Sequence, residues 1–374
     1  MDFGPTASDV EFRDRVRAVL AAPEAIELLA GFAHAEPGER DERPLYRFLG
    51  AAGLLAPHWP RRYGGGGGDA RCGAIAVEEL VRAGVPDTLL VNSILTVGQL
   101  ILSCGRDDQR DDLLPRLARG EIFASVLYTE PGAGSDLGAL TTAAEPVSDG
   151  FRITGSKAFN LSERCDVGLC AVRTSPASTR YGGLSLFLVD LRAPGVRIER
   201  MPSLPDEQFT LVHLDGVAVG RAALIGELDD GFALLTRALA FERTGFDFAL
   251  RAARWFDLAG RATPDDPDEL ERTGRYGARV AAARLLAWQA SLAAAGGDAD
   301  PTRAPVAKWY GSELAATVAR WALSRHGLDD DGRLPADVDR AYREAPGLTL
   351  AGGTSEMMLR TLAEQLTDAV AAEG

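Results

Sequence analysis

The sequence predicts an α+β protein in which a small sheet separates two helical regions. Apolar residues recur at helical spacing over roughly the first 120 positions. From about 121 to 222 the pattern changes to short strand-like runs divided by Gly, Pro and Ser. After Gly226 the helical spacing returns and continues to the end. We therefore expect an N-terminal helical domain at 1–120, a β-sheet domain at 121–222 and a C-terminal helical domain at 223–374.

The N-terminal region shows helical spacing most clearly at 10–20, 45–55 and 74–83. The most apolar stretch, 89–102, contains Asn, Ser and Gln and is too short to span a bilayer, so it predicts a buried helix. Five glycines at 64–68 form a connector, and no Lys-Ser/Thr follows them, which excludes a phosphate-binding P-loop.

The remaining elements follow from the same two periodicities. Strand-like runs occur at 151–154, 167–172, 184–189, 196–199 and 211–217. Long, alanine-rich amphipathic segments occur at 232–241, 275–295 and 304–325.

Composition excludes several classes of protein. The net charge of −14 argues against nucleic acid and against an anionic membrane surface. The four cysteines lack C-x-x-C spacing and the N-terminus is polar, so we expect reduced thiols, no signal peptide and a cytoplasmic location. The four histidines are scattered without ligand spacing, so we expect no metal site. Only two lysines occur among many Ala, Gly, Asp and Arg residues, a composition that suggests a GC-rich bacterial genome.

The string Tyr128-Thr-Glu-Pro-Gly-Ala-Gly-Ser-Asp136 is the most informative motif, because it follows directly on the apolar run Ile122–Leu127. Pro131 fixes φ, while Gly132 and Gly134 let the backbone approach a ligand closely. Successive free N–H groups in such a turn form a cradle for an anion or a polar ring edge. An ordinary loop remains the alternative if the turn is considered alone.

The full string resembles the flavin-contacting signature of the acyl-CoA dehydrogenase family. Other segments resemble that family in the right order along nearly the whole chain: Ala56–Pro60 with Tyr63–Gly65, Gly105–Gln109, and Gly352–Glu356 with Arg360. The resemblance implies a C-terminal four-helix bundle, a bound FAD and oxidation of an acyl thioester to its α,β-unsaturated form. A carboxylate would remove the α-proton, and the β-hydride would pass to flavin N5.

The resemblance also implies where that carboxylate lies. Many family members have a Glu immediately before the Gly-Thr of the C-terminal signature, but this chain has Gly352 there. A second branch places its Glu on the helix after the sheet, before an Arg, and Glu242-Arg243 occupies that place here. We therefore expect Glu242 to be the base, Arg243 to orient it and the Gly352 N–H to polarise the thioester. Glu130 and Glu356 are lesser candidates, and an ion-paired helix residue is the alternative reading of Glu242.

The implied flavin contacts come from three segments. They are Tyr128 and Thr129 at the pyrimidine edge, Gly134 and Ser135 near the pyrophosphate or the thioester arm, Phe159 against the ring, and Thr354 and Glu356 in the C-terminal loop. Leu161 stands where the family usually has a Ser or Thr whose hydroxyl reaches flavin N5. We expect Asn160 or Ser162 to be the available substitutes.

Partners are left open by the sequence. The thioester can be on coenzyme A or on an acyl carrier protein, and the resemblance implies an electron-transfer flavoprotein as acceptor. The Arg-x-x-Phe-Gly segment that meets a neighbouring subunit's FAD is absent, and 257–268 stands in its place. A homodimer, a homotetramer and a heterotetramer with a related subunit all remain, as do two other functions: a flavin monooxygenase and a non-catalytic partner subunit. The small Ala351 and Gly352 predict a pocket wide enough for a branched, cyclic or carrier-bound acyl group.

Overall fold

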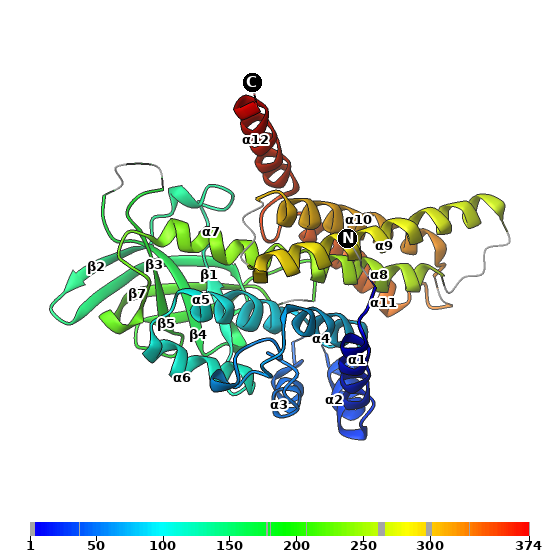
Figure 1. Cartoon of the computed structure of the whole chain (residues 1–374), viewed down its shortest axis with the longest axis horizontal. Coiled ribbons are helices and arrows are strands. Elements are labelled where there is room, and N and C mark those ends of the chain that lie inside the picture. The colour runs from blue at the N-terminus through cyan, green and yellow to red at the C-terminus, as the bar shows by residue number, and fades with distance from the viewer. Residues whose placement is uncertain are drawn as a thin grey trace.

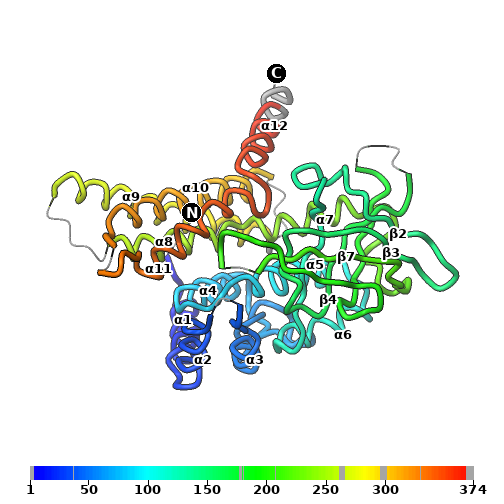
Figure 2. Tube along the Cα trace, turned by 180° about the vertical axis from the view of Figure 1, so that it is seen from behind, coloured from blue at the N-terminus to red at the C-terminus, as the bar shows by residue number. Residues whose placement is uncertain are grey.

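The computed structural model describes residues 4–36, 38–176, 179, 181–206, 208–260, 266–296, 301–328 and 330–373. Helices, a sheet and further helices follow one another along the chain, which confirms the predicted α+β class. Figures 1 and 2 show the sheet at one side of the molecule and the C-terminal helices at the other, with the N-terminal helices along the lower edge. Within the described residues, no helix is both long enough and apolar enough to cross a membrane.

The N-terminal helices begin at side chains that satisfy free backbone N–H groups. Thr6 and Asp9 form a capping box at the first helix, and the Asp69 side chain accepts from Cys72 N at the fourth. The predicted buried helix at 89–102 is present, and its residues Leu90–Gly98 form a π-helix, a conformation frequent at functional sites. The elements are α1 (Ala7–Leu20), α2 (Pro23–His34), α3 (Arg43–Ala51), α4 (Ala70–Arg82), π-helix η2 (Leu90–Gly98), α5 (Gln99–Cys104) and α6 (Asp107–Ala118).

The middle of the chain forms one eight-stranded sheet. Its order is β6-β7-β3-β2-β4-β5-β8, and β1 pairs with β4 in parallel from Ala124 opposite Val167 to Leu127 opposite Cys170. Because β4 is central, five consecutive residues of it, Gly168 to Val172, are buried. The strands are β1 (Ala124–Leu127), β2 (Ala143–Val147), β3 (Gly150–Asn160), β4 (Val167–Arg173), β5 (Leu184–Asp190), β6 (Val196–Arg200), β7 (Thr210–Gly220) and β8 (Leu224–Ile225).

The first two C-terminal helices, α7 and α8, are separated by a break at Gly245. Gly245 has a φ of +79° between α7 and α8, and a Cβ there would lie 2.8 Å from the backbone of Ala307. Helix α12 projects away from the remaining helices in both views (Figures 1 and 2). The helices are α7 (Gly231–Glu242), α8 (Phe246–Gly260), α9 (Pro267–Gly296), α10 (Arg303–Arg325), α11 (Ala336–Leu348) and α12 (Ser355–Glu373).

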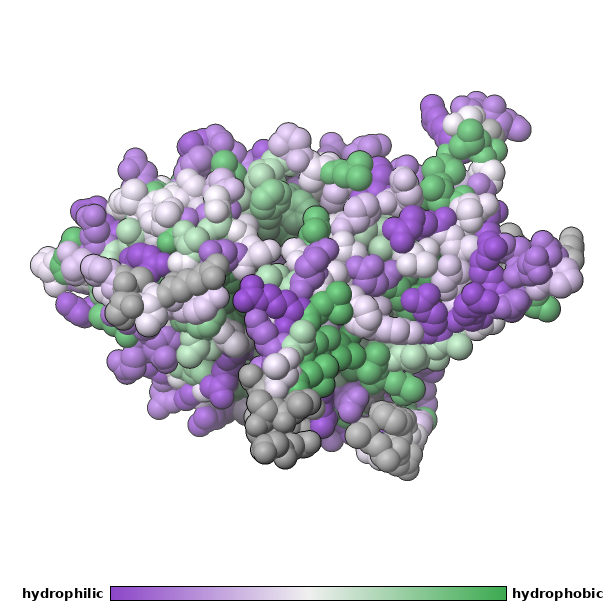
Figure 3. All heavy atoms as spheres, turned by 90° about the horizontal axis from the view of Figure 1, so that it is seen from above, coloured by the Kyte–Doolittle hydropathy of each residue, from purple (hydrophilic) through white to green (hydrophobic). Residues whose placement is uncertain are grey.

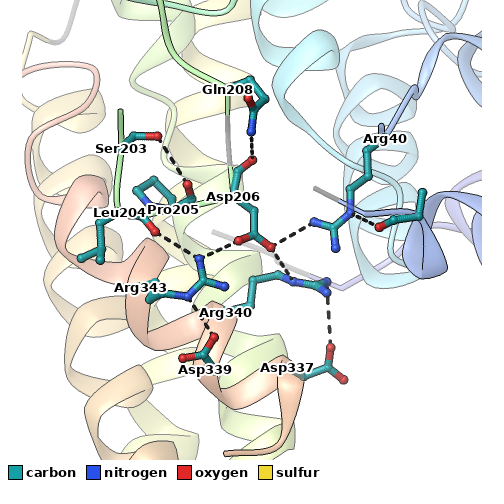
Figure 4. Close-up of polar contacts among 11 residues, drawn as sticks. Arg40, Ser203, Leu204, Pro205, Asp206, Gln208, Asp337, Asp339, Arg340 and Arg343 are labelled. Carbon is teal, nitrogen blue, oxygen red and sulfur yellow. Dashed lines mark hydrogen bonds and ion pairs between the residues drawn. The ribbon is translucent and has the colours of Figure 1, made fainter. Parts of the chain in front are cut away.

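One carboxylate joins the three parts of the chain (Figure 4). Asp206, in the loop between β6 and β7, pairs with Arg40 of the N-terminal part at 3.1 Å and with Arg343 of α11 at 2.6 Å. Arg340 approaches the same carboxylate at 3.4 Å. Burial acts to raise the pKa of Asp206, but Arg343 and Arg40 lower it below its usual value. Asp206 therefore remains ionised and holds the sheet against the helices on both sides.

Candidate functional site

The turn after β1 is held by a buried ion pair. Glu130 and Ala133 exchange backbone hydrogen bonds of 2.9 and 3.1 Å around Pro131 and Gly132. The Glu130 carboxylate accepts from Lys157 Nζ at 2.9 Å. Burial acts to raise the pKa of Glu130. The charge of Lys157 and hydrogen bonds from Thr141 and Thr142 outweigh burial and lower this pKa to about 2. Glu130 is therefore a structural anchor and a poor proton acceptor.

The aromatic residue at the end of β3 is held in an unusual conformation beside this turn. Ala158 N donates to Thr129 O at 2.9 Å, which places Phe159 next to the turn. Phe159 has a φ of +55° and is 63% exposed, with only an edge contact to Phe209. A non-glycine residue at positive φ costs on the order of 1–3 kcal/mol, and such residues cluster at binding sites.

The two proposed substitutes for a hydroxyl at 161 are both committed elsewhere. Asn160 is 4% exposed; its Oδ1 accepts from Thr210 and Ser162, and its Nδ2 donates to Lys157 O. Ser162 is fully buried and also lies 3.1 Å from Ser125 Oγ. Either side chain would have to give up a buried hydrogen bond in order to replace the missing donor. Position 161 offers its backbone and an apolar side chain.

Glu242 and Gly352 lie side by side, although they are far apart in sequence. A Cβ added at Gly352, which has a φ of +66°, would lie 3.4 Å from Glu242 Oε1. Arg243 Nε donates to Gly352 O at 2.6 Å, and a Cβ at Gly353 would lie 2.9 Å from the same guanidinium. Glu242 Oε2 is buried and has no hydrogen-bond partner among the described residues. The space beside this carboxylate is therefore kept by two glycines at positive φ.

Burial and the neighbouring positive charges have opposite effects on the pKa of Glu242. Burial raises the pKa of Glu242, whereas the Arg243 and Lys308 charges act to lower it. Tyr128 contributes a buried hydroxyl without a partner in the described chain, and burial followed by the Glu242 charge raises the pKa of Tyr128 well above its usual value. The end of β1 and the end of α7 therefore meet at one buried polar cluster.

Lys308 on α10 is the cation that the sequence did not indicate. It is 0% exposed, and its Nζ has no hydrogen-bond partner in the described residues, lying 5.3 Å from the centre of the Phe248 ring. Burial lowers the pKa of Lys308 to about 8, against the attraction of Asp247. Burial also raises the pKa of Asp247, against the charge of Arg251. One signal could have found Lys308: it is one of two lysines, and no other charged residue lies in the surrounding segment 304–311.

The remaining predicted residues lie at the edges of this cluster. Thr354 Oγ1 accepts from Met357 N at the start of α12. Glu356 is exposed, and its pKa is lowered by the backbone at this helix start and by the Thr354 hydroxyl. Gly134 and Ser135 are exposed in the turn after β1, and a Cβ at Gly134 would meet no atom within 4 Å.

Two cavities border the cluster and the sheet. The smaller, of about 60 Å³, is lined by Phe241 and Thr244, which flank Glu242 in sequence, and by His58, Gly73, Leu95 and Gln99. The larger, of about 480 Å³, lies among Leu161, Arg164 and the residues around Asp206. Neither lining includes Glu242, Arg243 or Gly352. Among the residues that the structure describes, no group of three His, Cys, Asp or Glu side chains is arranged to hold a metal ion.

Comparisons with known proteins agree across the whole chain. Models of the N-terminal, middle and C-terminal domains of acyl-CoA dehydrogenase match residues 6–121, 125–217 and 225–367. The chain is 30% identical to acyl-CoA dehydrogenase FadE29 of Mycobacterium tuberculosis, covering 86% of this chain and 87% of that protein. It is 31% identical to FadE34 of the same organism over 85% of this chain, but it spans only 45% of that longer protein. The solved Tcur3481-Tcur3483 steroid ACAD superimposes with a TM-score of 0.85 at 28% identity, covering 98% of this chain and 99% of that one. The chain therefore belongs to the acyl-CoA dehydrogenase family, whose members are flavoproteins, and is an oxidoreductase of the acyl-CoA dehydrogenase type.

Proposed function

We propose that the chain catalyses the FAD-dependent α,β-dehydrogenation of an acyl thioester, with Glu242 as the base. The observation that carries the proposal is the half-buried Glu242 carboxylate, whose buried Oε2 has no partner in the described chain and whose Oε1 lies against Gly352. A proton-abstracting carboxylate needs an unused lone pair that faces an open space, and the two glycines of the C-terminal loop leave that space.

The residues present fit FAD. The buried Tyr128 hydroxyl has no partner in the described chain, and the exposed Phe159 ring is held in place by a strained backbone. Tyr128 and Thr129 would meet the pyrimidine edge, Phe159 would pack on the ring, and the exposed turn at Gly134 and Ser135 would approach the pyrophosphate or the thioester arm. When bound, FAD supplies the acceptor for the hydrogen that leaves the β-carbon as hydride.

The protein's own part in the reaction is to take the α-proton and to stabilise the charge that develops. The Glu242 carboxylate accepts the proton from the α-carbon, while the positive charges of Arg243 and Lys308 favour its ionised form. The Arg243 bond to Gly352 O fixes the loop whose N–H would donate to the thioester oxygen. Preorganised donors of this kind contribute roughly 3–4 kcal/mol each to catalysis.

The acyl group would enter the small cavity beside Phe241 and Thr244, since these residues flank Glu242. The absence of a side chain at Gly352 and the small methyl group of its neighbour Ala351 support a branched, cyclic or carrier-bound acyl group. Either coenzyme A or an acyl carrier protein could present the thioester, and an electron-transfer flavoprotein would be the acceptor. One curated relative, 27% identical, is a subunit of a caffeyl-CoA reductase–Etf complex of Acetobacterium woodii.

Helix α12 supports assembly with further subunits. It projects from the body of the chain, and its Leu359 and Leu366, seven residues apart, are 45% and 63% exposed. The face drawn in Figure 3 likewise carries apolar patches among hydrophilic residues. Exposed apolar surface of this kind marks interaction sites. We propose a homodimer or homotetramer, or a heterotetramer with a related subunit.

The test of the base is Glu242→Gln, with Glu271→Gln as the matched control. Both variants remove one carboxylate charge, but Glu271 is exposed on α9, away from the proposed site. Glu242→Gln should lower kcat by on the order of 10²–10⁴-fold while the flavin absorbance is retained, and Glu271→Gln should stay near the wild-type rate. Near-normal dehydrogenation by Glu242→Gln would refute the assignment. Oxygen consumption that survives in this variant would instead indicate a monooxygenase.

A non-catalytic partner subunit is the second candidate, because the Arg-x-x-Phe-Gly segment is absent. Residues 257–260 complete α8, residues 261–265 lie outside the described residues, and α9 begins at Pro267. The visible spectrum of the chain purified alone separates the two candidates. Flavin bands near stoichiometric occupancy support the enzyme, whereas a chain that takes up FAD only when co-expressed with a related subunit supports the partner role.

A further inference from the structure

The cavity beside Glu242 is apolar on most of its wall but contains a polar corner. Leu95, Phe241 and Gly73 supply apolar wall. The polar lining residues are Thr244, Ser291 and, at one corner, His58 with Gln99. A Cβ at Gly73 would be 2.7 Å from His58 Nδ1, so a side chain at this position of α4 would collide with the imidazole.

His58 has a hydrogen-bonding atom that the described chain does not use. Its Nδ1 is buried and has no partner among the described residues. Gln99 Oε1 already accepts from Trp59 Nε1 at 3.1 Å. Burial lowers the pKa of His58 to about 4, against a hydrogen bond between the ring and the Gln99 side chain that acts to raise it, so the ring is neutral at physiological pH. A buried polar atom without a partner is unfavourable, and it needs either a water or a ligand group.

We propose that this corner selects acyl groups that carry a hydroxyl beyond the β-carbon, with His58 Nδ1 as the hydrogen-bonding partner. The inference rests on the proposed dehydrogenation, because it places the acyl chain in the cavity beside Glu242. A hydroxyl both donates and accepts, so it can pair with either tautomer of a neutral imidazole. A carboxylate would require a charged donor, which a neutral ring does not supply. The hydroxyl must lie beyond the β-carbon because the α and β C–H bonds are the reacting ones.

The first experiment compares two thioesters of equal length, one with a hydroxyl beyond the β-carbon and the other with a methyl group in its place. Turnover is followed with an artificial electron acceptor. Wild-type kcat/KM should favour the hydroxylated substrate by about tenfold or more, because the methyl group leaves Nδ1 unpaired. Equal values, or a preference for the methyl substrate, would overturn the inference and indicate that a bound water serves His58.

Variants and a binding measurement keep this outcome separate from the proposed function. His58→Phe should abolish the preference, while His34→Phe, on the exposed face of α2, should keep it. His58→Gln retains a hydrogen-bonding group and should keep part of it, which a purely structural role would not predict. In Glu242→Gln, calorimetry should show the same ratio in Kd between the two substrates without turnover. Failure to oxidise either thioester would refute the dehydrogenation itself, whereas oxidation of both without a preference would refute only the role of His58.

Discussion

Replacing Lys308 with Met should make the protein more stable while impairing its reaction. Lys308 is 0% exposed, and its amine has no hydrogen-bond partner in the described residues. The charge therefore loses its hydration on folding, and no hydrogen bond among the described residues compensates for that loss. Met has a similar length and no charge, and it adapts to irregular cores. Groups that are unfavourable for stability but lie beside a reactive carboxylate are typical of functional sites.

The magnitude follows from the pKa of Lys308, which burial lowers from 10.5 to about 8. At about 1.4 kcal/mol per pKa unit, holding this charge inside the fold costs roughly 3 kcal/mol at neutral pH. Since the folded pKa is below the unfolded one, the unfolded chain binds more protons between about pH 8 and pH 10.5. The contribution of Lys308 to the free energy of unfolding should therefore become less unfavourable as pH rises through this window, so the wild type should gain stability relative to Lys308→Met.

Denaturant unfolding at pH 7 and near pH 9.5 measures both effects. Lys308→Met should gain up to roughly 3 kcal/mol at pH 7, and the difference from the wild type should shrink at the higher pH. The acid limb of the kcat–pH profile should move to higher pH, because Glu242 loses a charge that favours its ionised form. Since the chain has two lysines, ¹³Cε-lysine labelling gives two signals, and the one lost in Lys308→Met should titrate near pH 8.

The other lysine provides the control. Lys157 is also 0% exposed, but its amine pairs with Glu130 at 2.9 Å. Lys157→Met leaves a buried carboxylate without its partner and should destabilise the protein by about 3–5 kcal/mol. The reasoning is refuted if Lys308→Met is destabilised at pH 7 to a similar extent, or if the difference in free energy of unfolding between Lys308→Met and the wild type is the same at pH 7 and near pH 9.5.

Two further changes test other parts of the structure. Gly352→Glu places a side chain at a φ of +66° and starts a second carboxylate 3.4 Å from Glu242 Oε1; it should lower stability by about 1–2 kcal/mol from strain alone and raise the pKa of Glu242 further. An unchanged acid limb of kcat would contradict this. Asp206→Asn removes the charge that joins three arginines and should cost about 1–3 kcal/mol at pH 7. Because the folded pKa of Asp206 lies below its usual 3.8, this contribution is present above about pH 4 and lost as pH falls through the folded value. Urea unfolding at pH 7 and pH 3 should show the gap between variant and wild type closing, and a constant gap would count against the ion pairs.

Elements with a strong periodic pattern were predictable from the sequence. The run at 167–172 became β4 at Val167–Arg173, and the segment at 304–325 became α10 at Arg303–Arg325. Strand β2, Ala143–Val147, was not expected, because its sequence contains Pro and lacks alternation, and its pairing with β3 decides its conformation. Helix α6, Asp107–Ala118, was not predicted as a separate element, because it is highly charged and contains Pro115, which makes its helical spacing of apolar residues weak.

The candidate site was predictable to the extent that a family motif marks it. The proximity of Glu242 to Gly352 was implied by the loss of a carboxylate at one position and its presence at the other. Lys308 and His58 could not be placed by the same reasoning, because what matters is that each has a buried nitrogen without a hydrogen-bond partner in the described chain. That burial depends on the packing of α8 against α10 for Lys308 and on the close approach of α4 for His58, which no local pattern encodes.

Because both lysines are buried, chemical modification of their amines can measure local opening of the folded structure. Reagents that acylate amines need a free, solvated side chain, and neither Lys157 nor Lys308 provides one in the folded state. Arginine carries the exposed positive charge and does not react with such reagents. Acylation at either lysine therefore measures how often the surrounding structure opens. Lys157 lies between the sheet and the turn after β1, and Lys308 lies between α8 and α10, so the two modification rates would report separately on two regions of the same chain.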